Sequence, residues 1–412
     1  MAGRDRAGSA ASAAGRRRVL AVLATVLAAV LGLAACTGTP AGTEPDDPAS
    51  ATPPPRPDAA DAPATGLASA TAGPAPAGSA GVLGLAPQAR IALHAGMRVA
   101  GLALGGSHLA WSGCLPCAGA AQDATEVYVA DLPAGRPRAV ARTEFRWGST
   151  SVIGLSGDTL VWLDEADVRD GDALRSHWAL RALDLRTRAP WTIAEGGRPG
   201  DPAREPVAFT RDGRVTWQLF DLPALGGPVS SADLGTRTVR AVTGQLPGLL
   251  RAVTARGLVY TSYEPDGVRD ADAPVLADAY LLPAGGGRAT ALTAAHQVTN
   301  AVANDEQMLW TTPNGDNQTL WSRAITAGTP TLVFTGPVLS FVPGHDFAAW
   351  TTREADSVVE VGTGGAPLAL PDVPAGGGVL AVDGDRVALL AVPDRGVPGP
   401  LTLVVVRVTT RH

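Results

Sequence analysis

The sequence predicts an all-β fold, a seven-bladed β-propeller of four-stranded antiparallel blades, and three observations support this class. A hairpin pattern that leads to a large side chain recurs through the chain, short apolar runs alternate with polar residues, and turn residues separate these runs. The 412 residues are 45% hydrophobic and 17% charged, so most of the chain has enough apolar side chains to bury a core. This composition excludes a wholly disordered protein.

The charge balance excludes one class of partner. The chain carries 33 basic and 39 acidic residues, a formal net charge of −6. A nucleic-acid-binding protein shows a basic face that contacts phosphates. We therefore expect no nucleic-acid partner.

The first 35 residues are typical of an export signal. A basic segment ends at Arg16-Arg17-Arg18, an apolar run fills positions 19–35, and Cys36 follows directly. Leu33-Ala34-Ala35-Cys36 resembles the bacterial lipobox, which implies a cleaved signal peptide (1–35), a diacylated Cys36 and the extracytoplasmic face of the cell membrane. An uncleaved membrane anchor is the alternative, because the apolar run approaches the length of a membrane span. The arginines also resemble a twin-arginine motif, so the export route stays open.

Residues 36–86 have the composition of a disordered linker. Ala, Pro, Thr, Gly, Ser and Asp make up nearly all of this segment, and it has hardly any large apolar side chains. Such a segment buries too little surface to offset its conformational entropy. We expect a folded domain over residues 87–412.

One repeat is visible seven times in this domain. Each copy has an apolar run, a turn of Gly, Asp or Asn, and a second run that leads to a large landmark residue. The landmarks are separated by 39 to 55 residues and are Trp111, Trp162, Trp217, Tyr260, Trp310, Trp350 and Leu389. Two further strand-like runs follow most landmarks, for example AYLLPAGGGRATALT after Tyr260. Four strands in each period of this length indicate propeller blades, and the wide rings are expected to pack neighbouring blades together.

The chain ends predict how the ring closes. The last repeat has strand patterns near 378–382, 385–392 and 401–410 and then stops, one strand short of a blade. Residues 88–94 alternate as a strand should, with Ile91 and Leu93 on one face. We expect this segment to pair with the C-terminal strand, which would remove an open seam.

Residues 87–412 resemble the TolB-like and WD-repeat-like propellers of exported bacterial lipoproteins. The likeness includes the turns between third and fourth strands, Asp131-Leu132-Pro133-Ala134-Gly135 and Leu282-Pro283-Ala284-Gly285. The Gly-His and Trp-Asp pairs of true WD repeats are not repeated here. The resemblance implies a propeller domain and leaves its ligand open.

The loop after the first landmark carries Cys114 and Cys117. After export, a Cys-x-x-Cys pair forms a small disulfide, a redox couple or half of a metal site. Ala118 stands where covalent haem attachment requires His, and the sequence shows no helix start that would activate a thiol. A structural disulfide is the preferred interpretation.

Acidic residues gather in loops that the repeat phase places on one face. They are Asp164, Glu165, Asp170 and Asp172 in the second repeat, Asp270 and Asp272 in the fourth, and Asp316 in the fifth. Oxygen ligands at alternate positions suit Ca²⁺, although the complete calcium-loop pattern is absent. Solvated acidic loops that favour a cationic partner are the simpler interpretation, and we assign no cofactor.

The sequence therefore predicts a monomeric, lipid-anchored module that binds a protein or glycan of the cell envelope. Loops 113–126, 164–177 and 264–278 are expected to form the binding face. The alternative is a propeller enzyme (lactonase-, lyase- or glycosidase-like) with a carboxylate or metal site at the channel mouth. The six His are scattered, and no Gly-x-Ser-x-Gly elbow occurs. The sequence assigns no catalytic residue.

Overall fold

A computed structural model describes 13 stretches of the chain, all within one compact unit. They are residues 82–115, 124–145, 148–170, 173–197, 205–221, 224–263, 277–315, 317–326, 328–352, 359–362, 367–369, 379–391 and 400–411. The predicted signal peptide, Cys36 and most of the predicted linker lie outside these residues. Across the described stretches, no helix is long and apolar enough to span a membrane.

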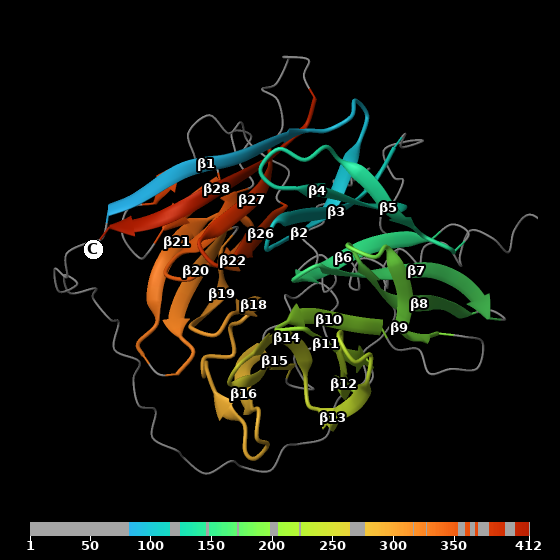
Figure 1. The fold of residues 1–412 in the computed structure, drawn as a ribbon. Coiled ribbons are helices and arrows are strands. Elements are labelled where there is room, and N and C mark those ends of the chain that lie inside the picture. Colours follow the sequence, from blue (N-terminus) through green and yellow to red (C-terminus); the bar gives the residue numbers. More distant parts are fainter. Residues whose placement is uncertain are drawn as a thin grey trace, which may run out of the picture. The chain divides into compact units, whose positions relative to one another are not determined.

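Six blades each consist of four consecutive antiparallel strands (Figure 1). The first three blades are β2 (Arg98–Gly105), β3 (His108–Cys114), β4 (Glu126–Asp131) and β5 (Arg138–Arg142); β6 (Ser149–Ser156), β7 (Thr159–Asp170), β8 (Ala173–Asp184) and β9 (Ala189–Gly196); and β10 (Glu205–Arg211), β11 (Arg214–Phe220), β12 (Gly227–Asp233) and β13 (Val239–Leu246). The next three blades are β14 (Leu249–Thr254), β15 (Gly257–Tyr263), β16 (Ala277–Pro283) and β17 (Thr290–Ala291); β18 (Asn300–Ala303), β19 (Gln307–Asn314), β20 (Asn317–Ala324) and β21 (Thr331–Gly336); and β22 (Val338–Pro343), β23 (Ala348–Thr352), β24 (Val359–Gly362) and β25 (Leu368–Ala369).

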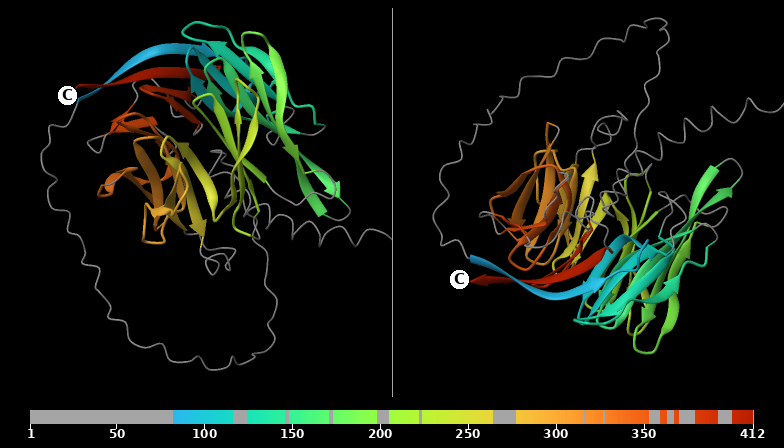
Figure 2. Two further views of the ribbon diagram at one scale, coloured as in Figure 1. Left: turned by 60° about the horizontal axis from the view of Figure 1, so that its bottom comes forward. Right: turned by 90° about the horizontal axis from the view of Figure 1, so that it is seen from above.

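One further four-stranded sheet joins the two ends of the folded unit. It contains β26 (Leu380–Asp383), β27 (Arg386–Ala391), β28 (Thr402–Arg411) and, as its outer strand, β1 (Val82–Ala92). β1 runs antiparallel to β28, with Ile91 opposite Leu403, and the two strands lie side by side in Figures 1 and 2. The predicted pairing of the chain ends is confirmed. β1 begins at Val82 rather than at residue 88, so it includes residues that were assigned to the linker.

The blade count from the sequence requires a correction. The sequence was interpreted as one repeat seen seven times, but only six blades are complete four-strand repeats. The last three strands reach four only by taking β1 from the other end of the unit. The all-β class is confirmed.

The landmark residues occupy the same position in every sheet. Each lies on the second strand opposite an apolar residue of the first strand, as Trp111 lies opposite Leu102 and Trp350 opposite Phe341. All seven landmarks are at most 5% exposed. Their clusters join neighbouring sheets, so the predicted packing role of the rings is confirmed.

The inner strands follow one another around a central axis. Each innermost strand contacts the next, from β2 through β6, β10, β14, β18 and β22 to β26, and β26 contacts β2 again (Figure 1). First-strand residues of successive blades therefore face a common channel, and the connections between second and third strands share one side of it.

The turns between first and second strands are joined to one another on the opposite side of the channel. The Gly213 amide donates to Ser156 Oγ (2.8 Å), and the Ala255 amide donates to Asp305 Oδ1 (2.8 Å). Asn304 Nδ2 donates to the Gly344 carbonyl (2.8 Å). These contacts fix the turns of successive blades relative to one another.

One predicted binding loop is a strand hairpin. Residues 164–170 continue β7, and residues 173–177 belong to β8, with Asp170 paired to Ala173. The physical reason is visible in the alternation of Ala166 and Val168 with the polar residues Asp167 and Arg169, which extends the strand pattern beyond the landmark. The prediction of a loop over 164–177 is therefore wrong.

Candidate functional site

The central channel contains a cavity of about 230 Å³. Its walls come from inner-strand residues of several blades and are mainly apolar, with side chains such as Ile153, Phe209 and Phe341. The polar side chains that line it are Ser151, Glu165, Asn300 and Ser340. A mostly apolar cavity with a few polar groups is the usual composition of a ligand site.

A buried guanidinium lies near one mouth of this channel. Arg251, at the start of β14, is 4% exposed and donates through Nη1 to Asn300 Oδ1 (3.1 Å) and through Nε to Thr261 Oγ1 (3.0 Å). Glu165 lies at the same mouth, because it pairs with Ser149 at the start of β6. The channel mouth on the side where second strands connect to third strands therefore has both an anionic group, Glu165, and a cationic group, Arg251.

Asp164 lies on the opposite face of β7 from Glu165, since adjacent strand residues face opposite sides of a sheet. Its side chain is fully buried, with Arg181 Nε 2.9 Å from Asp164 Oδ2, and Arg181 also binds the exposed Glu144 of the first blade (2.7 Å). Burial raises the pKa of the Asp164 carboxyl from 3.8 to about 6, against the opposing effect of Arg181. The structure therefore places this predicted site residue in an ion-pair cluster between two blades.

The raised pKa of Asp164 predicts a pH effect on stability. The folded state holds the Asp164 proton more tightly than the unfolded chain, so the group stabilises the fold below pH 4. That contribution is lost as the pH rises through about 6. In the original protein, the Asp164 carboxyl should lower the free energy of unfolding by roughly 2 to 3 kcal/mol as the pH rises from about 4 to above about 6. Asp164→Asn should lack this decrease, and urea unfolding at each pH measures it. Glu144→Gln should keep most of the decrease, because burial is the main cause of the raised pKa of Asp164 and the Glu144 charge is the smallest. An unchanged slope in Asp164→Asn would contradict the assignment.

A second group of polar side chains lies at the fourth blade. Asp278, at the start of β16, is 3% exposed, and its Oδ2 lies 2.8 Å from His296 Nδ1. Asp278 Oδ1 accepts from Thr293 Oγ1 (2.8 Å) and from the His296 amide (3.1 Å). His296 is largely exposed and has a left-handed backbone (φ 48°), which costs about 1 to 2 kcal/mol for a residue other than glycine. A buried carboxylate thus orients an exposed imidazole.

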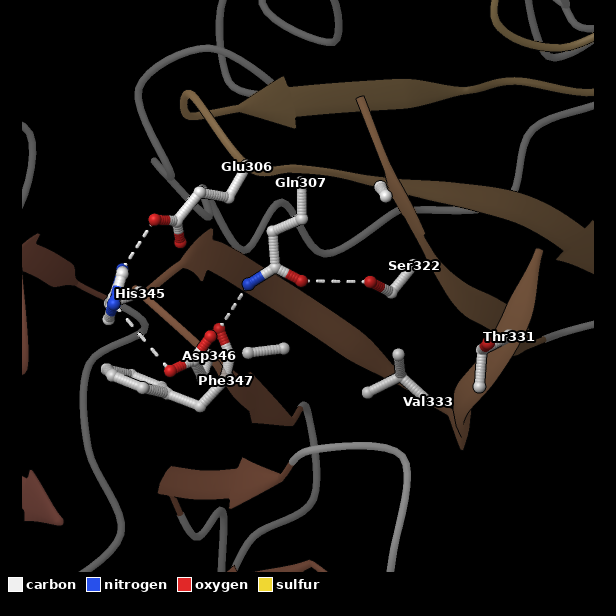
Figure 3. Close-up of a pocket in the computed structure, with 10 residues that line it drawn as sticks. Glu306, Gln307, Ser322, Thr331, Val333, His345, Asp346 and Phe347 are labelled. Atoms are coloured by element: carbon white, nitrogen blue, oxygen red, sulfur yellow. Dashed lines mark hydrogen bonds and ion pairs between the residues drawn. The ribbon is translucent and has the colours of Figure 1, made fainter. Parts of the chain in front are cut away.

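A third group lies on the opposite side, in a pocket between the fifth and sixth blades (Figure 3). Glu306 and His345 come from the first hairpin turns of these blades, and Asp346 follows His345. The ligand atoms of the three side chains all lie within 4.8 Å of one another. Within the described stretches, this is the one group of three or more His, Cys, Asp and Glu with such spacing.

The other predicted site residues are mostly beyond what the structure describes. Cys114 is the last residue of β3 and is disulfide-bonded. Its predicted partner Cys117 lies outside the described residues, so the pairing stays a prediction. Asp170 is described only through its backbone at the end of β7. Five further predicted residues also lie outside the described stretches: Cys36, Asp172, Asp270, Asp272 and Asp316.

The sequence prediction did not single out Glu306, His345 and Asp346. Their signal was present in the repeat phase, because Asn304-Asp305-Glu306 and Gly344-His345-Asp346 are the same turn in consecutive repeats. Alignment of the repeats places these two turns at equivalent positions of neighbouring blades, and so places Glu306 near His345 and Asp346. The binding face that the sequence predicts is on the opposite side of the channel.

Comparison with solved structures shows the β-propeller fold. The propeller domain of the trilobed protease from Pyrococcus furiosus has a TM-score of 0.55 at 12% identity, over 76% of this chain and 95% of that one. TolB from Acinetobacter baumannii has 16% identity and a TM-score of 0.38, and the match covers 59% of this chain and 58% of the TolB chain. An oligogalacturonate lyase in complex with manganese has 13% identity and a TM-score of 0.41, over 74% of each chain.

No protein-family model matches the chain, and no curated protein sequence matches it. The Pyrococcus domain is described as having an open velcro topology, whereas β1 and β28 pair in the present chain. At these identities the likeness defines the fold alone.

Proposed function

We propose that this protein is a lipid-anchored binding or scaffolding module on the extracytoplasmic face of the cell membrane. Its ligand, an envelope protein or glycan, enters the channel mouth beside Glu165 and Asn300. The composition of the channel lining is the observation that carries this proposal. Within the described part of that lining, Glu165 is the one titratable side chain, whereas an enzyme needs several converging groups.

The rigidity of the ring supports a binding role. The channel walls are inner strands whose turns are hydrogen-bonded to the next blade, as Gly213 is to Ser156 and Asn304 is to Gly344. A wall that is already ordered loses little entropy when a ligand binds. This arrangement favours recognition by a preformed surface.

Site-specific photo-crosslinking in intact cells tests the proposal. A photoreactive side chain at Ser340, inside the channel, should give one dominant crosslink to an envelope protein or glycan. The same side chain at Val239, which is 54% exposed on the outer strand β13, is the matched control and should not give it. Ser151→Trp, which fills the channel, should reduce the crosslink at least tenfold. An equal crosslink from both positions, or none from Ser340, would refute a channel ligand.

A propeller enzyme is the second candidate, and the Asp278–His296 pair favours it. The Asp278 carboxylate lies 2.8 Å from His296 Nδ1 and orients the imidazole, an arrangement that suits a histidine general base. Turnover of a lactone, uronate or glycoside by the purified full chain, lost in His296→Ala, would establish this function. Crosslinking from Ser340 should persist in His296→Ala if binding and catalysis are separate.

The lipid anchor is proposed from the sequence. Acylation of Cys36 places the propeller at the membrane surface, and two acyl chains suffice for stable anchoring. Cells that express the full chain should incorporate a palmitate analogue into the protein, and Cys36→Ala should abolish incorporation. Labelling that persists in Cys36→Ala would exclude this site of acylation.

A further inference from the structure

Two turns from neighbouring blades bring an imidazole between two carboxylates. His345 Nδ1 lies 2.6 Å from Glu306 Oε1, and His345 Nε2 lies 3.7 Å from Asp346 Oδ2. Figure 3 shows the His345 ring between the two acidic side chains. All three side chains are between 45% and 61% exposed, so a solvent ion has direct access to them.

The backbone of the fifth-blade turn is held by Asn304 and Gln307. Asn304 Oδ1 accepts from the amides of Glu306 (3.0 Å) and Gln307 (2.9 Å), which fixes the turn that carries Glu306. Gln307 Nε2 donates to the carbonyls of Gly344 (3.0 Å) and Phe347 (2.7 Å). The Gln307 amide therefore spans the sixth-blade turn on either side of His345 and Asp346.

The sixth-blade turn is also tied to the next sheet. The His345 amide donates to the carbonyl of Gly384, in the turn between β26 and β27 (3.2 Å). Phe347, one residue beyond Asp346, is 3% exposed and packs in a buried cluster with Leu389. The backbone atoms that carry the three ligand side chains are thus fixed by three sheets, while the side chains remain exposed.

A pocket of about 370 Å³ opens beside the three side chains. Ser322, Thr331 and Val333 form its further wall, and Ser322 Oγ donates to Gln307 Oε1 (2.9 Å; Figure 3). The pocket leaves space on one side of the three side chains for water or for a further ligand of an ion. A three-residue site with an open position requires such space.

We propose that Glu306, His345 and Asp346 bind a divalent first-row transition-metal ion, with Zn²⁺ as the best match. One imidazole nitrogen and two carboxylate oxygens are a ligand set that zinc accepts, whereas Ca²⁺ and Mg²⁺ prefer oxygen ligands alone. Zinc bonds to these atoms are about 2.0 to 2.2 Å long, so the ligand atoms of a tetrahedral site lie roughly 3.3 to 3.6 Å apart. Binding therefore requires the 2.6 Å separation of His345 Nδ1 and Glu306 Oε1 to widen and the Asp346 carboxylate to swing towards the same ring nitrogen, and the exposed side chains can rotate to do both.

The ion would connect the fifth and sixth blades. Glu306 belongs to one blade, and His345 and Asp346 belong to the next, so coordination adds a link between them. Without metal, the three side chains form an exposed ion-pair group, which contributes little to stability. Metal binding should therefore raise the melting temperature of the folded ring, because the unfolded chain does not hold the three ligands together.

Titration of the metal-stripped full-length protein with zinc chloride tests the site. Isothermal titration calorimetry should show one binding event that disappears in His345→Ala and weakens at least tenfold in Asp346→Asn. His94→Ala removes another exposed imidazole and is the matched control, which should bind zinc as the original protein does. Magnesium and calcium chloride should give no comparable event. The Co²⁺-loaded protein should lose a visible absorption band in His345→Ala.

The melting temperature separates metal binding from misfolding. The variants without metal should melt close to the original protein, and zinc should raise the melting temperature of the original protein and His94→Ala but not of His345→Ala. Equal zinc affinity and stoichiometry in the original protein and His345→Ala would overturn the proposal. Absence of zinc binding to the original protein would also overturn it.

Discussion

Ile91→Asp is expected to lower the free energy of unfolding by at least about 4 kcal/mol, the largest effect that we predict. Ile91 is 3% exposed, lies opposite Leu403, and packs in the cluster that contains Trp111 and Leu390. A carboxylate at this position loses its hydration without gaining a partner. The midpoint of urea unfolding, followed by tryptophan fluorescence, measures the effect.

The matched control introduces the same charge one residue away. Ala92 is exposed on β1 and lies opposite Thr402, so Ala92→Asp should change the unfolding free energy by no more than about 0.5 kcal/mol. Ile91→Asp should also free β28 as an unpaired edge, and an open edge promotes self-association, which size-exclusion chromatography detects. If both variants have the same urea midpoint, the packing of β1 against the ring does not contribute to the stability of the folded domain.

Trp350→Ala should lower the unfolding free energy by about 3 to 5 kcal/mol. Trp350 is 1% exposed, and its ring centre lies 5.5 Å from that of Phe334. The same cluster includes Leu309 and Leu320 of the fifth blade, so the truncation leaves a cavity between two blades. Urea unfolding again provides the measurement.

Trp350→Phe is the matched variant for this position. The indole Nε1 is buried and has no hydrogen-bond partner among the described residues, so its removal sacrifices no hydrogen bond. Trp350→Phe keeps an aromatic ring, so its loss of unfolding free energy should be no more than about half of the loss in Trp350→Ala. A loss as large as that of Trp350→Ala would show that the second ring of the indole, rather than aromatic packing in general, fills the interface.

The repeat pattern was the most informative feature of the sequence. It placed Trp111 and Trp350 on second strands and identified the pairing of the first and last strands, because both depend on local alternation and spacing. It did not find the start of β1 at Val82, where Gly84 and Pro87 interrupt the pattern. Nor did it distinguish a long hairpin from a loop at residues 164–177, since charged residues occur in both.

The candidate site was predicted less well than the fold. Asp164 was assigned to an exposed acidic loop, but its side chain lies between two blades beside Arg181. Acidic residues in sequence do not reveal which carboxylates are buried, because that depends on the neighbouring blade. Glu306 and His345 are unremarkable in sequence and meet only because two blades are adjacent.

The sequence by itself determined the all-β class, the phase of the landmark side chains and the joining of the chain ends. These properties follow from alternation along single strands, which fixes the face that each side chain occupies. Only the tertiary structure decided which side chains meet across blades, such as Glu306 with His345 or Arg211 with Asp305. These contacts between blades depend on the twist of each sheet and on its packing against the next sheet, and no local pattern in the chain encodes the resulting distances.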